Sequence, residues 1–87
     1  MKDLKLTKTN IGDDGAIIIF KALESNISVI NLNICKNLLS EKSLDSIVNC
    51  LKINKTIKSV NLAFNLFNAQ TKDKFKSLVR SNIKLIF

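Results

Sequence analysis

The feature that most constrains this chain is a 28-residue period that runs through its 87 residues without a gap. Apolar residues recur at this spacing, in the columns Leu4, Leu32 and Val60; Leu6, Ile34 and Leu62; and Leu23, Leu51 and Val79. Asparagine recurs in the same way, at Asn26, Asn54 and Asn82. Internal periods of this length are typical of chains built from repeated units, each of which needs its neighbours to cover its apolar face.

Two different periodicities lie inside each unit. The first part alternates between apolar and polar residues, which predicts short strands near 3–6, 31–34 and 59–62. The second part has helical spacing, which predicts helices near 13–25, 41–53 and 69–81, with Ser40 as an N-cap. A strand followed by a helix, repeated, predicts an α/β fold with parallel strands inside and helices outside, coiled in the right-handed sense.

The domain organisation follows from the same period. We expect a single domain over residues 1–87, with units at 1–28, 29–56 and 57–84 and a partial fourth strand at 85–87. The fourth strand is expected because Leu85 falls in the column of Val29 and Ile57. Leu32 and Leu51, in the middle unit, are predicted to be buried from both sides.

The segments LKLTKTNIGDDGAIIIFKALESN and VNLAFNLF resemble the leucine-rich repeat family, most closely its 28-residue, ribonuclease-inhibitor-like subclass. The first unit matches the family's helical half with Ile11, Gly12, Asp13, Gly15, Ala22, Leu23 and Asn26. The third unit matches its strand half with Ile57, Val60, Leu62, Asn65 and Phe67. The resemblance implies a short horseshoe-shaped leucine-rich-repeat solenoid and, since the family mostly binds other proteins, a protein-binding role.

The sequence departs from the family pattern at a few positions. Thr9 stands where the first ladder asparagine is expected. The second unit has Ser40 and Ser43 in place of the two glycines of the first, and the third has Asn68 and Thr71. These departures affect the expected loop geometry and leave the expected architecture unchanged.

Composition excludes several kinds of chemistry. The chain has no histidine, so a histidine-based triad or an imidazole metal site is impossible. The Gly-Asp-Asp-Gly segment at 12–15 is interpreted as a helix start and not as a pair of catalytic or metal-binding carboxylates. We therefore expect no enzyme activity, no cofactor and no metal.

The location of the protein is inferred from its thiols and its apolar runs. Cys35 and Cys50 do not make a disulfide framework, and Cys50 shares a core column with Ala22 and Leu78. The start of the chain is polar, and its longest apolar run, Ala16 to Phe20, is too short to span a membrane. The expectation is an intracellular, cytoplasmic protein without membrane contact.

Strand alternation predicts the candidate binding surface. If Leu4 and Leu6 point to the core, the intervening side chains line the opposite, concave face of the sheet. This candidate protein-binding set comprises Asp3, Lys5, Thr7, Asn31, Asn33, Cys35, Ser59, Asn61 and Ala63, with Phe64 at a strand exit. An ordinary solvated strand face is the alternative interpretation.

The two ends of the chain differ in charge. The formal net charge is +7, and residues 57–87 carry six Lys or Arg and one acid, whereas residues 1–28 carry four of each sign. Lys72, Lys74, Lys76 and Arg80 form a candidate basic patch. This patch is either a polar C-terminal cap or a site for nucleic acid or an acidic protein.

The opposite flank is apolar. Ile18, Ile19 and Ala22 are predicted to lie on the side of the first helix away from the second unit. Either further units precede them, or a partner or a second copy covers them. The leading hypothesis is a protein–protein interaction module that uses the concave face and this flank. The alternatives are binding of nucleic acid or an acidic surface through the basic helix, and regulation of a partner enzyme.

Overall fold

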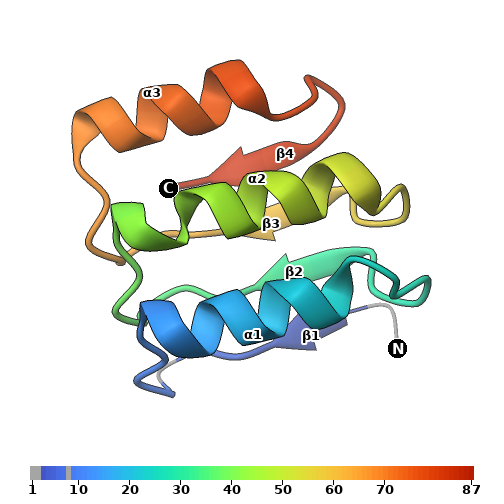
Figure 1. The fold of residues 1–87 in the computed structure, drawn as a ribbon, viewed down its shortest axis with the longest axis horizontal. Coiled ribbons are helices and arrows are strands. Elements are labelled where there is room, and N and C mark those ends of the chain that lie inside the picture. Colours follow the sequence, from blue (N-terminus) through green and yellow to red (C-terminus); the bar gives the residue numbers. More distant parts are fainter. Residues whose placement is uncertain (1–2, 8) are drawn as a thin grey trace.

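The computed structural model describes residues 3–7 and 9–87. Its elements are β1 (Asp3–Lys5), α1 (Asp13–Leu23), β2 (Asn31–Asn33), a 3-10 turn η1 (Glu41–Ser43), α2 (Leu44–Ile53), β3 (Ser59–Asn61), α3 (Ala69–Leu78) and β4 (Lys84–Ile86). The four strands form one parallel sheet in the order β1-β2-β3-β4. All three α-helices cover the same face of this sheet, which gives two layers (Figure 1).

The core lies between the two layers. Leu32 of β2 and Val60 of β3 point from the sheet into it, and Phe20, Ile47 and Phe75 point into it from the helices. The predicted core positions Leu32 and Leu51 are both buried.

Cys50 is also part of this core. Its side chain is 0% exposed, so the interpretation of this cysteine as a core residue is confirmed. Burial, together with the nearby charge of Glu24, raises the pKa of the Cys50 thiol to about 12.

The strand register follows the period between the first three strands and departs from it at the fourth. Leu4 pairs with Leu32 and Leu32 with Val60, each 28 residues apart, whereas Val60 pairs with Leu85, only 25 residues on. The prediction that Leu85 aligns with Val29 and Ile57 is therefore wrong. The fourth strand occupies Lys84–Ile86 instead of 85–87.

This shorter step has a local cause. α3 ends at Leu78, three residues before its predicted end, and Val79 is already extended with φ −93° and ψ 143°. The shift brings Phe87 onto the core side, where its ring centroid lies 6.3 Å from Phe67 and 5.6 Å from Phe75. Three aromatic rings thus close the C-terminal end of the core.

The overall shape corrects the predicted fold class in part. The mixed α/β class and the parallel sheet are confirmed, but the predicted leucine-rich-repeat solenoid, a horseshoe, is not shown. The molecule is a compact globule of 29 × 27 × 18 Å. Four strands of three residues and three helices pack against each other as one two-layer body, and this short chain does not develop an arc.

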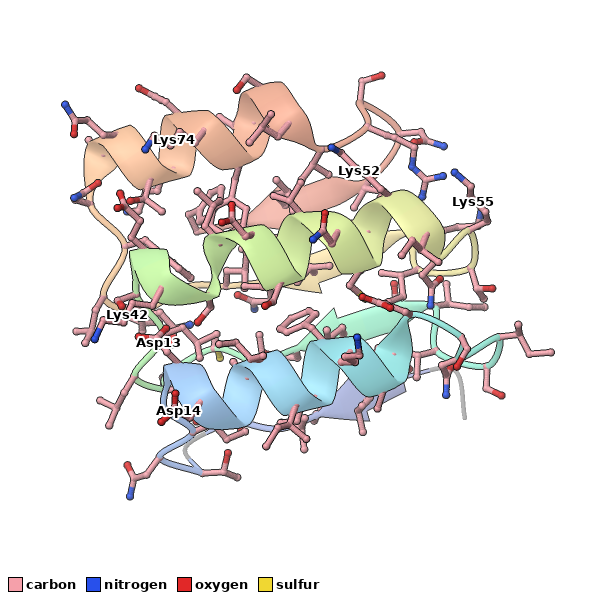
Figure 2. All side chains as sticks on the ribbon, viewed as in Figure 1. Asp13, Asp14, Lys42, Lys52, Lys55 and Lys74 are labelled. Carbon is pink, nitrogen blue, oxygen red and sulfur yellow. The ribbon has the colours of Figure 1, made fainter. Side chains whose placement is uncertain are left out.

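Carboxylates and hydroxyls join the starts of consecutive helices. Asp13, in the first turn of α1, accepts hydrogen bonds from the backbone N–H of Ser40 at 2.8 Å and from the Ser40 and Ser43 hydroxyls. Glu41, one period later, accepts from the Thr71 hydroxyl at 3.4 Å. Figure 2 shows Asp13 at the junction between the starts of α1 and α2. The serines and threonine that depart from the family pattern are therefore the donors of these contacts.

Buried asparagine side chains hold the loops that follow the strands. The Asn37 amide donates to the carbonyls of Leu6, Ile34 and Cys35, and its Oδ1 accepts from backbone N–H groups of Thr9 and Ile11. Asn65 repeats this pattern one period later. These amides satisfy backbone groups that would otherwise be buried without partners, so the strand-exit loops have fixed positions.

Candidate functional site

The outer face of the sheet, which the helices leave uncovered, carries most of the predicted binding residues. Six of them lie on the strands and point away from the helices: Asp3, Lys5, Asn31, Asn33, Ser59 and Asn61. Thr7, Cys35 and Ala63 follow directly after the strand ends and are half-buried. The structure therefore brings the predicted set together on one side of the molecule.

Hydrogen bonds between neighbouring strands fix the polar side chains of this face. Asn31 Nδ2 donates to Asp3 Oδ1 at 2.8 Å, and Ser59 Oγ donates to Asn31 Oδ1 at 2.6 Å. Farther along the strands, Asn33 and Asn61 each accept a hydrogen bond from a backbone N–H two residues ahead. The face thus presents donors and acceptors in set directions instead of freely rotating side chains.

A shallow hollow of about 210 Å³ runs across this face. Its lining includes Asp3, Lys5, Asn31, Asn33, Ser59 and Asn61, together with Ile86 of β4. The sequence prediction missed Ile86 because it kept the 28-residue period to the end of the chain. The alternation of Ile83, Leu85 and Phe87 with Lys84 and Ile86 was the signal that could have placed this side chain on the outer face.

An exposed apolar patch adjoins the strand exits. We call Leu38, Phe64 and Leu66 the loop patch, and all three side chains are exposed. Phe64 is 76% exposed and lies in the left-handed region with φ 57°. A bulky residue rarely adopts this conformation, which costs on the order of 1–2 kcal/mol. Strain of this kind tends to be kept at functional positions.

The loop patch is held in place by the loops beneath it. The backbone N–H of Leu66 donates to the carbonyl of Leu39 at 2.7 Å, and that of Leu38 to the carbonyl of Ile11 at 2.9 Å. Lys36 Nζ lies 5.7 Å from the centroid of the Phe64 ring, within reach of a cation–π contact. The sequence prediction included Phe64 and missed Leu38 and Leu66, although these two are 28 residues apart.

The four residues of the predicted basic patch have different environments. Lys74 Nζ lies 3.7 Å from Glu41 Oε2, and Arg80 Nη2 donates to the carbonyl of Asn54 at 3.1 Å. Lys76 is exposed and Lys72 is half-buried. Two of the four cations are thus directed toward their own chain, which reduces what the patch can offer to an anionic partner.

Other kinds of site are not found in the described part of the chain. Residues 3–7 and 9–87 contain no group of three or more Cys, Asp or Glu side chains that could hold a metal ion. No helix within those ranges has the length and apolar character needed to cross a membrane. Cys35 and Cys50 are both free thiols.

Comparisons with known proteins give one informative match. No protein-family model matches the sequence, and no curated protein matches it. The structure resembles the solved structure of actin-binding site 2 of leiomodin-1, with a TM-score of 0.87 and 22% sequence identity. The match covers 99% of this chain and 53% of that one, so this chain spans about half of its length. At this identity the likeness concerns the fold alone.

These comparisons overturn the family prediction made from the sequence. Neither membership of the leucine-rich repeat family nor the ribonuclease-inhibitor-like subclass is supported. No family model matches, and the matched structure is an actin-binding site. The residues that suggested the family, such as Gly12, Gly15 and the Asn65 column, are explained here by the helix start and the loop hydrogen bonds described above.

Proposed function

We propose that this chain binds another protein, through a surface made of the outer face of the sheet and the loop patch. The observation that carries the proposal is Phe64, an exposed aromatic side chain in a strained backbone conformation beside a strip of fixed polar groups. The likeness to an actin-binding site is consistent with a protein-binding role and does not identify the partner.

The two parts of this surface would contribute differently to binding. An aromatic ring buried at an interface removes about 150–250 Å² from water, and aromatic residues are common among the side chains that dominate binding energy. The polar strip has few large side chains, so it would contribute mainly direction and selectivity through hydrogen bonds. Because Asn31 and Ser59 are already held by their neighbours, little additional side-chain freedom would be lost on binding.

Actin is the first partner to test, because the matched structure is an actin-binding site. The proposal is for binding without catalysis, and for action inside the cell. The nucleic-acid alternative is not retained as a second proposal, because Lys74 and Arg80 contact their own chain.

The test compares three forms of the chain: the wild type, Phe64→Ala and Ile53→Ala. Ile53 is an exposed apolar residue at the end of α2, away from the proposed surface, and serves as the matched control. Binding to purified actin, and retention of proteins from an extract of the source cells, would be measured at low and moderate salt. A partner held by the wild type and Ile53→Ala but lost by Phe64→Ala supports the proposal. A partner retained equally by all three forms contradicts it, and a steep loss with salt would favour an electrostatic partner instead.

A further inference from the structure

The outer side of α1 is an apolar surface that no described residue covers. Ile18 is 71% exposed, and Ile17 and Ala22 are exposed beside it. One period later the same helical side is in contact, because α2 packs against α1 with Cys50, the counterpart of Ala22, fully buried. The outer side of α1 thus has the form of a packing surface.

The charges around this surface are complementary to themselves. Asp14 and Lys21 are both exposed and lie four residues before and three residues after Ile18, so all three share one helical face. Figure 2 shows Asp14 on the side of α1 away from α2. If two α1 helices meet in antiparallel fashion about a two-fold axis near Ile17 and Ile18, Asp14 of each comes beside Lys21 of the other.

The neighbouring strand carries the same pattern. β1 is an edge strand with the sequence Asp3-Leu4-Lys5, and its outer backbone groups have no strand beside them. Antiparallel pairing of β1 with a second β1, centred on Leu4, would place Asp3 of each chain opposite Lys5 of the other. Opposite charges that face each other across strands are favourable, whereas like charges are not. Asp3 Oδ1 is already bonded to Asn31, and its second oxygen would meet the new partner.

A single axis can serve both elements. α1 lies directly over β1, so a two-fold axis perpendicular to the sheet can pass near Leu4 and Ile18 together (Figure 1). We propose that two copies of this chain associate through this N-terminal flank, formed by β1 and the outer side of α1, and join their sheets into one of eight strands. Two-fold dimers of this isologous kind are the commonest form of oligomer.

The distribution of charge favours this flank over the opposite one. The whole chain carries +7, but residues 1–28 have four lysines and four acids, whereas residues 57–87 have six Lys or Arg and one acid. Two copies therefore approach each other with the least repulsion when their N-terminal flanks face. The β4 edge, with Lys84, Leu85 and Ile86, has no acid to complement its lysine.

The first test is sedimentation of the wild type, Ile18→Lys and Ile53→Lys over a range of concentrations. Both substitutions add one positive charge at an exposed apolar helical position, so neither should unfold the chain, and melting curves would verify this. We expect a dimer for the wild type and Ile53→Lys and a monomer for Ile18→Lys. A monomeric wild type, or a dimer that Ile18→Lys leaves intact, would assign the flank to another occupant and overturn the proposal.

The second test examines the charge pairing. Asp14→Lys alone places two lysines beside each other at both contacts, and Lys21→Glu alone places two acids there, so each variant should dimerise more weakly than the wild type. An equimolar mixture of the two should dimerise again, because both contacts in the mixed dimer pair opposite charges. Single variants that dimerise like the wild type, or a mixture no better than its components, would contradict the two-fold arrangement.

Discussion

The backbone N–H of Ser40 donates to the carboxylate of Asp13 at 2.8 Å, which ties the start of the second helical segment to the start of the first. The Ser40 and Ser43 hydroxyls donate to the same carboxylate. This one acid therefore joins two neighbouring units at the edge of the core. Partial burial raises the pKa of Asp13, but the hydrogen bonds from Ser40 and Ser43 and the charge of Lys42 outweigh it, so the net pKa is lowered.

This lowered pKa gives a prediction for stability against pH. A carboxyl whose pKa is lower in the folded state than its unfolded value of about 3.9 stabilises the fold above that value. The stabilisation is lost as the pH falls through the folded pKa. Asp13→Asn should destabilise the chain by about 1–2 kcal/mol near neutral pH and lose less stability on acidification than the wild type. Urea unfolding from about pH 6 to about pH 2.5 measures this.

The control for that experiment is Asp45→Asn. Asp45 is exposed in the first turn of α2 and has no hydrogen-bonded hydroxyl partners among the described contacts. Its substitution should change both the midpoint and its pH dependence much less. Parallel pH profiles for the wild type and Asp13→Asn would count against the role given to Asp13.

The middle of the core should be the most sensitive to truncation. Leu32→Ala and Leu51→Ala should each destabilise the chain by about 2–5 kcal/mol, since both side chains are buried between neighbouring units. Such a loss is comparable with the whole stability of a small domain. Thermal melting is the measurement, with the exposed Ile53→Ala as the matched control. A melting curve unchanged by either core substitution would refute the core assignment.

The Asn37 amide is expected to matter more than an ordinary polar side chain. It is buried and bonded to five backbone groups in loops of two units. Asn37→Ala should cost about 2–4 kcal/mol, because several buried carbonyls and N–H groups lose their partner. Asn49→Ala, at an exposed position of α2, is the control and should be nearly neutral. Equal urea midpoints for the two variants would show that water replaces the amide without loss.

Two truncations of Phe64 separate strain from binding. Both Phe64→Ala and Phe64→Gly remove the ring, but glycine adopts φ 57° without steric cost. Phe64→Gly should therefore be more stable than Phe64→Ala by about 0.5–1 kcal/mol, after the entropy cost of glycine is included. Chemical denaturation gives the difference. An alanine variant as stable as the glycine variant would show that this loop relaxes and that Phe64 is not strained.

Much of the fold was predictable from the 28-residue period. The period placed the strands and helices to within a few residues, because apolar columns such as Leu4, Leu32 and Val60 must lie side by side to share one core. The last strand was predicted out of register, since nothing in the column pattern shows that α3 ends at Leu78. The solenoid and the family assignment were wrong because they extended a local pattern to an overall shape and an ancestry that neither the structure nor the comparisons support.

The candidate site was predictable only in part, for a related reason. Strand alternation placed Asn31, Asn33 and Asn61 on the outer face, because side chains on a strand must alternate. It could not place Leu38 or Leu66, whose exposure depends on loop conformation. Nor could it show that Lys74 and Arg80 are directed toward Glu41 and Asn54, since such contacts depend on tertiary packing.

The carboxylate–hydroxyl contacts also determine the order in which the units can follow one another. Asp13 meets hydroxyls at Ser40 and Ser43, and Glu41 meets the hydroxyl of Thr71. The first unit has Gly12 and Gly15 at the donor positions, and the third has Ala69 at the acceptor position. A permuted chain with the first unit placed after the second would leave Glu41 facing glycines without a donor. Anyone lengthening this protein by duplicating a unit at its C-terminal end would first need to restore an acid at Ala69.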